Sequence, residues 1–339
     1  MTALDLPNLR GSEPSTFLAA LGVLSLLSHD QATTDDPPVD AANRQPTLCW
    51  PHGPHGPAQI DAPGIADLEH LAEALSGIAR SMCDNDELLP GAGPAFPPRK
   101  QGKAPDPTRS IERAEVTSWV ESTRANGDHR PWLAAIVATN DVITSKTTQS
   151  RLGLMGRSPI FDAGPGTVSM SGTLTQCRDA AIDAGAMEQA LRTGARRDGS
   201  TGAYLDWRAD RDAADLASKR DASNFGDPVT AWLALMGLRC APLVCVLGRA
   251  GSALCPPRRV GHLRKPLLWP VWRHPLDFDA VTVLLSHPTL VVGPDGTLDQ
   301  VRPGALEALG VCSVFGSSRL SKGNNDGAYG PPIELWPPR

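Results

Sequence analysis

The sequence predicts an α+β fold, in which several helices pack against mixed sheets of short strands that irregular loops connect. Helical and strand-like segments alternate irregularly along the chain, which argues against a barrel or a doubly wound sheet. The 32 Gly and 32 Pro residues are spread along the sequence and predict many turns and long connections. The hydrophobic content of 41% is enough for a large core.

The chain length of 339 residues favours one large domain or two small ones, because domains commonly contain about 100–200 residues. We place a boundary just before a polar stretch at 144–157. Residues 1–142 then form an N-terminal α/β region with a basic, Pro-rich loop near 90–109. Residues 143–339 form a C-terminal α+β region.

The N-terminal region is predicted to contain a helix at residues 12–28. Its apolar residues keep helical spacing, and Ser12 or Ser15 can cap its first amide groups, with Pro14 tolerated in the first turn. Gly22, in its middle, indicates that another element approaches closely. The other elements predicted here are short strands at 47–50 and 58–61, helices at 65–82 and 110–123, and a buried element at 132–142.

The C-terminal region contains one helix with clear sequence signals, which we predict at residues 227–238. Asp227 can cap it, Pro228 suits its first position, and Trp232 lies on its apolar face. The other elements of this region are predicted from shorter runs of apolar residues. They are helices at 174–184, 187–193, 278–285 and 305–309, and strands at 167–170, 243–247, 267–272, 289–292 and 311–315.

Three polar segments are candidates for contact with nucleic acid: the basic Pro-rich loop, residues 144–157 and residues 317–325. Cations pair with phosphates with little geometric demand, and hydroxyl and amide groups commonly contact the backbone or base edges. Each segment also fits an ordinary solvent-exposed loop or turn. The predicted contact residues are Lys100, Lys103, Lys146, Gln149, Arg151, Arg157, Arg319, Lys322, Asn324 and Asn325.

The sequence carries no catalytic signature. It contains no Gly-X-Ser-X-Gly motif, no Walker loop and no Gly-X-Gly-X-X-Gly motif after a strand. Cys240, Cys245 and Cys255, with a histidine seven residues after the last of them, lack the tight spacing of a structural zinc site. We therefore expect no catalytic residue, no metal and no cofactor.

Two pairs of side chains are open to more than one interpretation. Trp269 and Trp272 can stack on a base, or they can be anchors of the core or of a protein interface. His52 and His55 have the spacing of a weak metal motif, but their Gly and Pro neighbours favour a surface loop.

We expect a cytoplasmic protein without a membrane segment. The N-terminus lacks the pattern of an export signal, and the apolar run at 17–27 is shorter than the about 20 residues that span a bilayer. Seven cysteines at irregular spacing favour reduced thiols. The net charge of −5 excludes an even basic coat, so nucleic-acid binding needs local basic patches or a more basic partner.

Five stretches in chain order resemble segments of CRISPR-associated proteins of the type I-U subtype, also called type I-G. They are LRGSEP at 9–14 running into FLAALG at 17–22, LDWRADRD at 205–212, AWLALMGL at 231–238, LWPVW at 268–272 followed by Pro275, Leu276 and a helix ending at Leu285, and the last strand with its Ser-Ser-Arg turn. Together they span most of the chain. One departure is Ala209, because the family often has proline at that position.

The resemblance implies a large-subunit-like component of Cascade, the type I interference complex, which is a ribonucleoprotein of antiviral defence. Such a subunit is non-catalytic and lies beside the CRISPR RNA that other Cascade subunits bind. It helps to recognise target double-stranded DNA through a flanking motif and to recruit the helicase–nuclease. Two alternatives stay open: a structural or adaptor protein of the same machinery with a Trp-rich contact surface, and an unrelated cytoplasmic enzyme.

Overall fold

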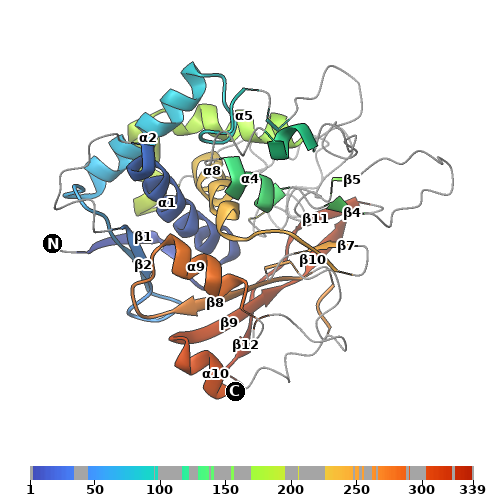
Figure 1. Ribbon diagram of the computed structural model, residues 1–339. Coiled ribbons are helices and arrows are strands. Elements are labelled where there is room, and N and C mark those ends of the chain that lie inside the picture. The colour runs from blue at the N-terminus through green and yellow to red at the C-terminus, as the bar shows by residue number, and fades with distance from the viewer. Residues whose placement is uncertain are drawn as a thin grey trace, which may run out of the picture.

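The computed structural model confirms the α+β prediction, with helices packed on small antiparallel sheets (Figure 1). The structure describes residues 3–33, 45–94, 96–97, 117–121, 129–136, 139–140, 154–155, 169–194, 205, 226–246, 249–251, 254–255, 262–264, 266–287, 290, 303–322 and 325–337. For some residues within these helices and strands, only the backbone is described. No helix in this part of the chain is long and apolar enough to cross a membrane.

The first sheet is three-stranded and antiparallel. Its strands, in spatial order, are β1 (Leu4–Arg10), β3 (Pro57–Asp61) and β2 (Thr47–Cys49). β2 and β3 confirm the two short strands predicted in this part of the chain. β1 was not predicted, because its register shifts between Leu6 and Arg10 and its buried residues do not alternate regularly.

The second sheet lies in the C-terminal region. Its strands, in spatial order, are β12 (Ile333–Trp336), β9 (Val311–Ser317) and β8 (Leu267–Trp272). β8 carries Pro270, which has no N–H to donate, and its place at the edge of this sheet tolerates the loss. Every residue of β8 is buried, so this strand belongs to the core.

The two sheets adjoin where β2 meets the chain that leaves β8. Leu48 and Leu276 exchange both backbone hydrogen bonds, at 2.9 and 3.1 Å. The Trp50 amide donates to the carbonyl oxygen of Trp272 at 2.9 Å. The indole Nε1 of Trp272 donates to the carbonyl oxygen of Leu48 at 2.8 Å. These bonds fix the N-terminal sheet beside the C-terminal one.

Two helices cross in close contact above the sheets. α1 (Pro14–Thr33) packs against α8 (Pro228–Met236) and the 3₁₀-helix η4 (Gly237–Cys240) that continues it. A methyl group on Gly22 would overlap the backbone of Leu233, and one on Gly237 would overlap the carbonyl oxygen of Leu18. The expectation that Gly22 permits a close approach is therefore confirmed.

The predicted capping of α1 by serine is wrong. α1 begins at Pro14, and among the described residues neither Ser12 nor Ser15 accepts a hydrogen bond from its first turn. The hydroxyl of Thr16 instead donates a hydrogen bond to the carbonyl oxygen of Arg10 at 2.7 Å. The helix also extends beyond its predicted end at residue 28.

The remaining helices are α2 (Leu68–Asp84), α4 (His129–Ile136), α5 (Met170–Ala181), α6 (Ala184–Arg192), α9 (Phe278–Leu285) and α10 (Pro303–Ala308). Apart from α4, which covers part of the buried element predicted at 132–142, they agree broadly with the predictions. Of the helix predicted at 110–123, the structure describes only residues 117–121, which are helical. The strand predicted at 167–170 is wrong at its end, because Ser169 caps α5 through the amide of Gly172 and Met170 is already helical. The strand predicted at 289–292 lies almost wholly outside the described residues.

Three small two-stranded pairs complete the described part of the chain. They are β4 (Thr139–Asn140) with β5 (Leu154–Met155), β6 (Val244–Val246) with β7 (Arg249–Gly251), and β10 (Arg319–Lys322) with β11 (Asn325–Tyr329). The last pair forms a hairpin in the polar stretch after the final predicted strand, where Ser321 pairs with Asp326 and Lys322 pairs with Asn325.

An aromatic cluster joins the helices to both sheets. Phe17 of α1 stacks on Trp50 with ring centroids 5.4 Å apart, and it meets Trp269 and Trp272 at 6.2 and 6.1 Å. The large buried cluster contains residues from both predicted regions, so the two regions share one core. In Figure 1, α1, α2, α5 and α8 lie above the long strands β8 and β9.

Candidate nucleic-acid interface

Most of the predicted contact residues lie outside the part of the chain that the structure describes. These are Lys100, Lys103, Lys146, Gln149, Arg151, Arg157 and Asn324. The structure describes the side chain of Arg319, and it gives the backbone positions of Lys322 and Asn325. Contact of all ten residues with nucleic acid stays a prediction.

The guanidinium of Arg319 is packed inside the molecule. Arg319 is 5% exposed, and its Cζ lies 4.1 Å from the centre of the Tyr329 ring. The hydroxyl of Tyr329 lies 3.6 Å from Sγ of Cys255. The expectation that this segment projects its arginine from the sheet edge is therefore wrong. A phosphate contact by Arg319 would require the guanidinium to leave the ring.

The hairpin formed by β10 and β11 brings two other predicted residues together. Lys322 and Asn325 are directly opposite partners at the end of the β10–β11 ladder. The two backbone positions are therefore adjacent across the hairpin, and lysine and asparagine are residue types that commonly contact a nucleic-acid backbone.

The base of the Pro-rich loop is held firmly by side chains of two helices. The carboxylate of Glu87 accepts a hydrogen bond from the Gly91 amide at 3.0 Å. Arg178 of α5 donates to the carbonyl oxygen of Glu87 at 2.7 Å. Trp132 of α4 donates from Nε1 to the carbonyl oxygen of Pro90 at 3.0 Å. The chain that leads into Lys100 and Lys103 therefore starts from a fixed point.

Trp269 and Trp272 are core residues. Both are 0% exposed. Nε1 of Trp269 donates to the carbonyl oxygen of Gly11 at 2.7 Å, and Nε1 of Trp272 donates to the carbonyl oxygen of Leu48. Stacking on a base and a Trp-rich contact surface built on this pair are both wrong, because neither ring is accessible. The core interpretation is confirmed.

Two of the three cysteines with unusual spacing, Cys240 and Cys255, are small buried side chains. Sγ of Cys240 lies 4.0 Å from the carbonyl oxygen of Leu21, whereas Cys255 packs against the Tyr329 hydroxyl. Burial raises the pKa of the Cys240 thiol to about 12 and the pKa of the Cys255 thiol to about 11. Within the described ranges, no group of three or more His, Cys, Asp or Glu residues could hold a metal ion.

The predicted surface loop at His52 and His55 is confirmed. Both histidines are exposed, on two consecutive turns closed by bonds from Gly53 to Trp50 and from Gly56 to Gly53. The ring of His55 meets Phe315 edge-on at 6.3 Å. The loop therefore covers one end of the aromatic cluster.

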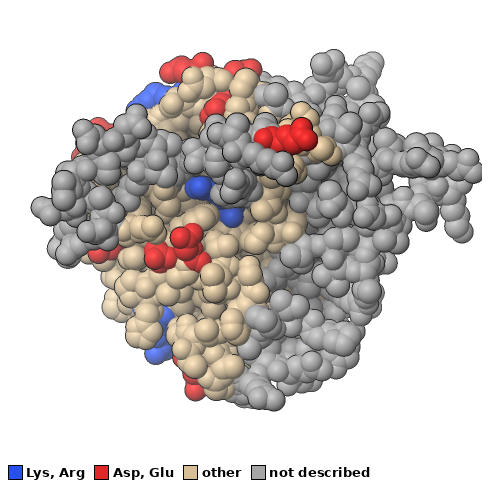
Figure 2. All heavy atoms as spheres, viewed as in Figure 1, with Lys and Arg blue, Asp and Glu red and all other residues tan. Residues whose placement is uncertain are grey.

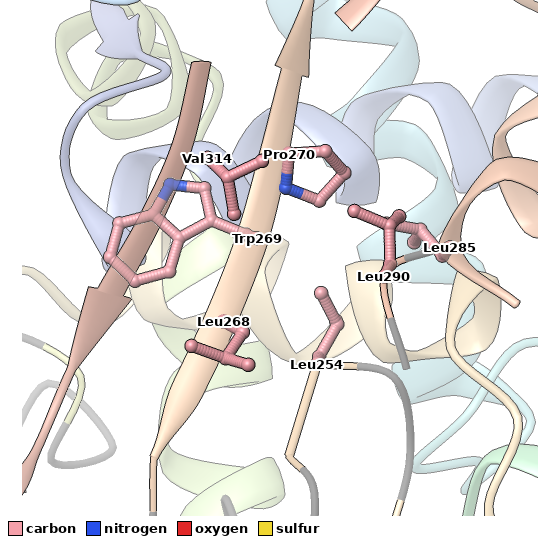
Figure 3. Close-up of a pocket in the computed structure, with 7 residues that line it drawn as sticks. All are labelled: Leu254, Leu268, Trp269, Pro270, Leu285, Leu290 and Val314. Carbon is pink, nitrogen blue, oxygen red and sulfur yellow. The ribbon is translucent and has the colours of Figure 1, made fainter. Parts of the chain in front are cut away.

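A small apolar pocket lies beside β8 (Figure 3). Leu254, Leu285 and Leu290 approach Pro270 from separate segments. The other lining residues are Leu268, Trp269 and Val314. The lining carries no acid, base or nucleophile, and its one polar side-chain atom, the indole nitrogen of Trp269, is bonded to Gly11. The pocket is a small gap in the packing, and its lining supplies no catalytic group.

Charges of both signs are scattered over the described residues on one face of the molecule. Figure 2 shows one face, on which lysine and arginine side chains occur singly among separate acidic groups. The described residues of this face form no continuous basic patch. Among the described residues of this face, the cations therefore offer only local points for nucleic-acid contact.

Three of the stretches that carry the resemblance pack against one another. Gly11 lies so close to Val271 and Trp50 that a methyl group there would be 2.8 Å from Val271 Cγ1. α1 crosses the AWLALMGL helix at Gly22 and Gly237. LRGSEP-FLAALG, AWLALMGL and LWPVW therefore meet in one interior, although more than 200 residues separate the first from the last.

Comparison with known proteins gives no relative. No protein-family model matches the chain, and no curated protein or solved structure is significantly similar to it. A functional proposal therefore depends on how the resembling stretches pack and on where charge and hydrogen-bonding groups lie.

Proposed function

We propose that the protein is a non-catalytic, nucleic-acid-handling subunit of a type I CRISPR effector complex, of the large-subunit kind. One observation supports this proposal: three of the five stretches that resemble type I-U proteins pack against one another. Scattered chance matches on the surface would have no reason to meet. Here they meet at the start of α1, along the α1–α8 crossing and on β8.

The glycines of these stretches have a steric purpose. Gly11, Gly22 and Gly237 each lie where a methyl group would overlap or crowd a neighbouring element. The motifs therefore correspond to requirements of one fold, since each glycine is needed for a contact between two of the stretches. This supports treating the resemblance as a likeness of whole folds.

The charge of the chain fits a subunit that acts beside an RNA-bearing scaffold. A net charge of −5 leaves no general attraction for a polyanion. Local contacts from Lys322, Asn325 and the cationic loops would suffice if other subunits hold the CRISPR RNA. The chain would then contribute contacts to target double-stranded DNA and its flanking motif, and a surface for the helicase–nuclease.

The test is assembly in the presence and absence of this chain. Co-expression with the other subunits and a CRISPR RNA should yield a complex that contains the chain and binds matching double-stranded DNA. Omission of the chain should leave an RNA-bearing particle that loses most of its affinity for the duplex. A chain that purifies without RNA and without subunits would contradict the proposal.

A further inference from the structure

The β10–β11 hairpin extends from the second sheet as a two-stranded ribbon. β9 ends at Ser317 and β10 begins at Arg319, whereas β11 ends at Tyr329 and β12 begins at Ile333. The ladder between β10 and β11 shifts its register between Arg319 and Ser321. A two-stranded hairpin is at best marginally stable in water by itself, so the position of this one depends on its contacts with the rest of the chain.

Backbone hydrogen bonds fix the end of the hairpin that joins the sheet. The Arg319 amide donates to the carbonyl oxygen of Arg264 at 3.1 Å, and the Gly330 amide donates to the carbonyl oxygen of Ser318 at 2.8 Å. The Ser317 hydroxyl donates to the carbonyl oxygen of Gly330 at 2.6 Å. These bonds determine where the two strands leave the sheet.

A buried arginine stacks on the ring of its cross-strand partner at the same end. Arg319 and Tyr329 are directly opposite in the ladder, and Cζ of the guanidinium lies 4.1 Å from the ring centre. Arg319 is 5% exposed and Tyr329 is 1% exposed. A buried charge is costly unless other groups compensate for the lost water, and the face of an aromatic ring does so in part. Because the pair is desolvated, this contact between the two strands is stronger than it would be on the surface.

The ring also ties the hairpin to the edge of β8. The Tyr329 hydroxyl lies 3.6 Å from Sγ of Cys255, which is 1% exposed. The neighbouring Leu254 accepts a hydrogen bond at its carbonyl oxygen from the Leu268 amide of β8, at 2.6 Å. Arg319, Tyr329 and Cys255 therefore form a continuous buried contact between the hairpin and the second sheet.

We propose that Arg319 is a positioning residue for nucleic-acid binding by the hairpin and acts through its stack on Tyr329. The stack sets the direction in which the hairpin leaves the sheet. It thereby places the far end of the hairpin, where Lys322 and Asn325 are opposite partners, for contact with a nucleic-acid backbone. Arg319 itself contacts no phosphate in this assignment, because its guanidinium is buried against the ring. This inference rests on the proposed function and assigns one part of it to a named contact.

Binding of a labelled DNA duplex to the full chain, measured by fluorescence anisotropy, tests the assignment. Arg319→Gln and Tyr329→Leu should each weaken binding about tenfold, the effect of losing a buried cation–π contact. The double variant should bind no more weakly than either single variant, because both changes remove the same contact. Arg319→Lys should restore most of the affinity, because an ammonium group can also lie on the ring face.

Alkylation of Cys255 reports on the stack independently of nucleic acid. Arg319→Gln and Tyr329→Leu should raise the rate at which iodoacetamide modifies Cys255 by about tenfold, because local opening of the hairpin uncovers the thiol. Cys240 is buried beside α1 and should react as slowly as in the wild type. An unchanged rate at Cys240 shows that the rest of the fold is intact.

Two matched variants keep the stack and control the experiment. Tyr329→Phe removes the hydroxyl but keeps the ring face, so it should weaken DNA binding much less than Tyr329→Leu does. Arg192→Gln removes an exposed cation of α6, far from the hairpin in sequence, and should leave both DNA binding and the alkylation of Cys255 unchanged.

The outcomes separate this assignment from the proposed function. If Arg319 left the ring to contact a phosphate, Tyr329→Leu would bind DNA as tightly as the wild type or more tightly, and that result overturns the assignment. Faster alkylation of Cys255 with unchanged DNA binding also overturns it, since the stack is then only structural. A wild type that binds no duplex contradicts the nucleic-acid handling in the proposed function, whereas a wild type that binds while these variants are unaffected contradicts only the role of Arg319.

Discussion

Gly22 of α1 lies directly against the backbone of Leu233 in α8, and no side chain fits between the two helices at this point. Gly22→Ala should therefore destabilise the protein by about 1–3 kcal/mol, because overpacking outweighs the gain of up to about 1 kcal/mol in helix propensity. Urea unfolding followed by circular dichroism measures the change.

Gly77 provides the matched control for this substitution. It lies within α2, and the nearest atom to a methyl group there would be Nη2 of Arg80 at 3.9 Å. Gly77→Ala should stabilise the protein by about 0.5–1 kcal/mol through helix propensity alone. If both glycine variants shift stability in the same direction, the close approach of α1 and α8 is not the cause.

The elements that the sequence predicts best are those with local signals. The helix at Asp227 has its cap, its first-turn proline and its apolar face within a few residues of one another, and α8 follows that pattern. β1 was not predicted, because its bulge interrupts the alternation of apolar and polar residues that is typical of a strand. The β10–β11 hairpin escaped because its polar composition is equally typical of a turn.

The candidate site depends more on contacts distant in sequence, and these are not visible in a single sequence. Nothing near Arg319 reveals that its guanidinium lies on a ring ten residues later. Ser12 and Ser15 look like caps in the sequence, yet among the described residues neither hydroxyl accepts from the first turn of α1, and the backbone there bonds to Pro54 and Trp269. The partner segments are more than 30 residues away.

Replacing Trp269 should lower the stability of the protein and should have no selective effect on nucleic-acid binding. Trp269→Phe leaves the buried carbonyl oxygen of Gly11 without its donor, which should cost about 1–3 kcal/mol in unfolding free energy. Trp232→Phe is the control, because the Trp232 indole nitrogen has no hydrogen-bond partner within the described structure. Trp232→Phe should lower the free energy of unfolding by less than Trp269→Phe does. A Trp269 variant with unchanged stability and lost DNA binding would restore the base-stacking interpretation.

Buried thiols should make the protein less stable in alkali. Burial raises the pKa of Cys177 and Cys240 from 9.0 to about 12. Below pH 9 the thiols are neutral in both folded and unfolded chains, so their contribution to the free energy of unfolding is fully present. Between pH 9 and about 12 only the unfolded chain ionises, which lowers the free energy of unfolding by about 1.4 kcal/mol per pH unit for each thiol.

Urea unfolding of the wild type and Cys240→Ala between pH 8 and pH 10.5 tests this dependence. The variant should lose stability less steeply above pH 9, whatever its stability at pH 8. Alkylation gives an independent measure: at pH 8, iodoacetamide should modify the exposed Cys83 while sparing Cys177 and Cys240 until the chain unfolds. Equal slopes for variant and wild type would show that Cys240 is not protected by burial.

Reversal of charge at Arg151 and Arg157 tests the loop predicted to contact DNA. Arg151→Glu/Arg157→Glu should weaken binding of duplex DNA and reduce the magnitude of the salt slope by about 0.9 for each phosphate contact that is lost. Arg192→Glu, on the exposed surface of α6, changes the net charge by half as much and should leave the slope unchanged. Anisotropy titrations at several salt concentrations separate a direct phosphate contact from a general change in charge. A slope that stays constant in the double variant removes residues 144–157 from the interface and leaves the basic Pro-rich loop and the β10–β11 hairpin as the remaining candidates.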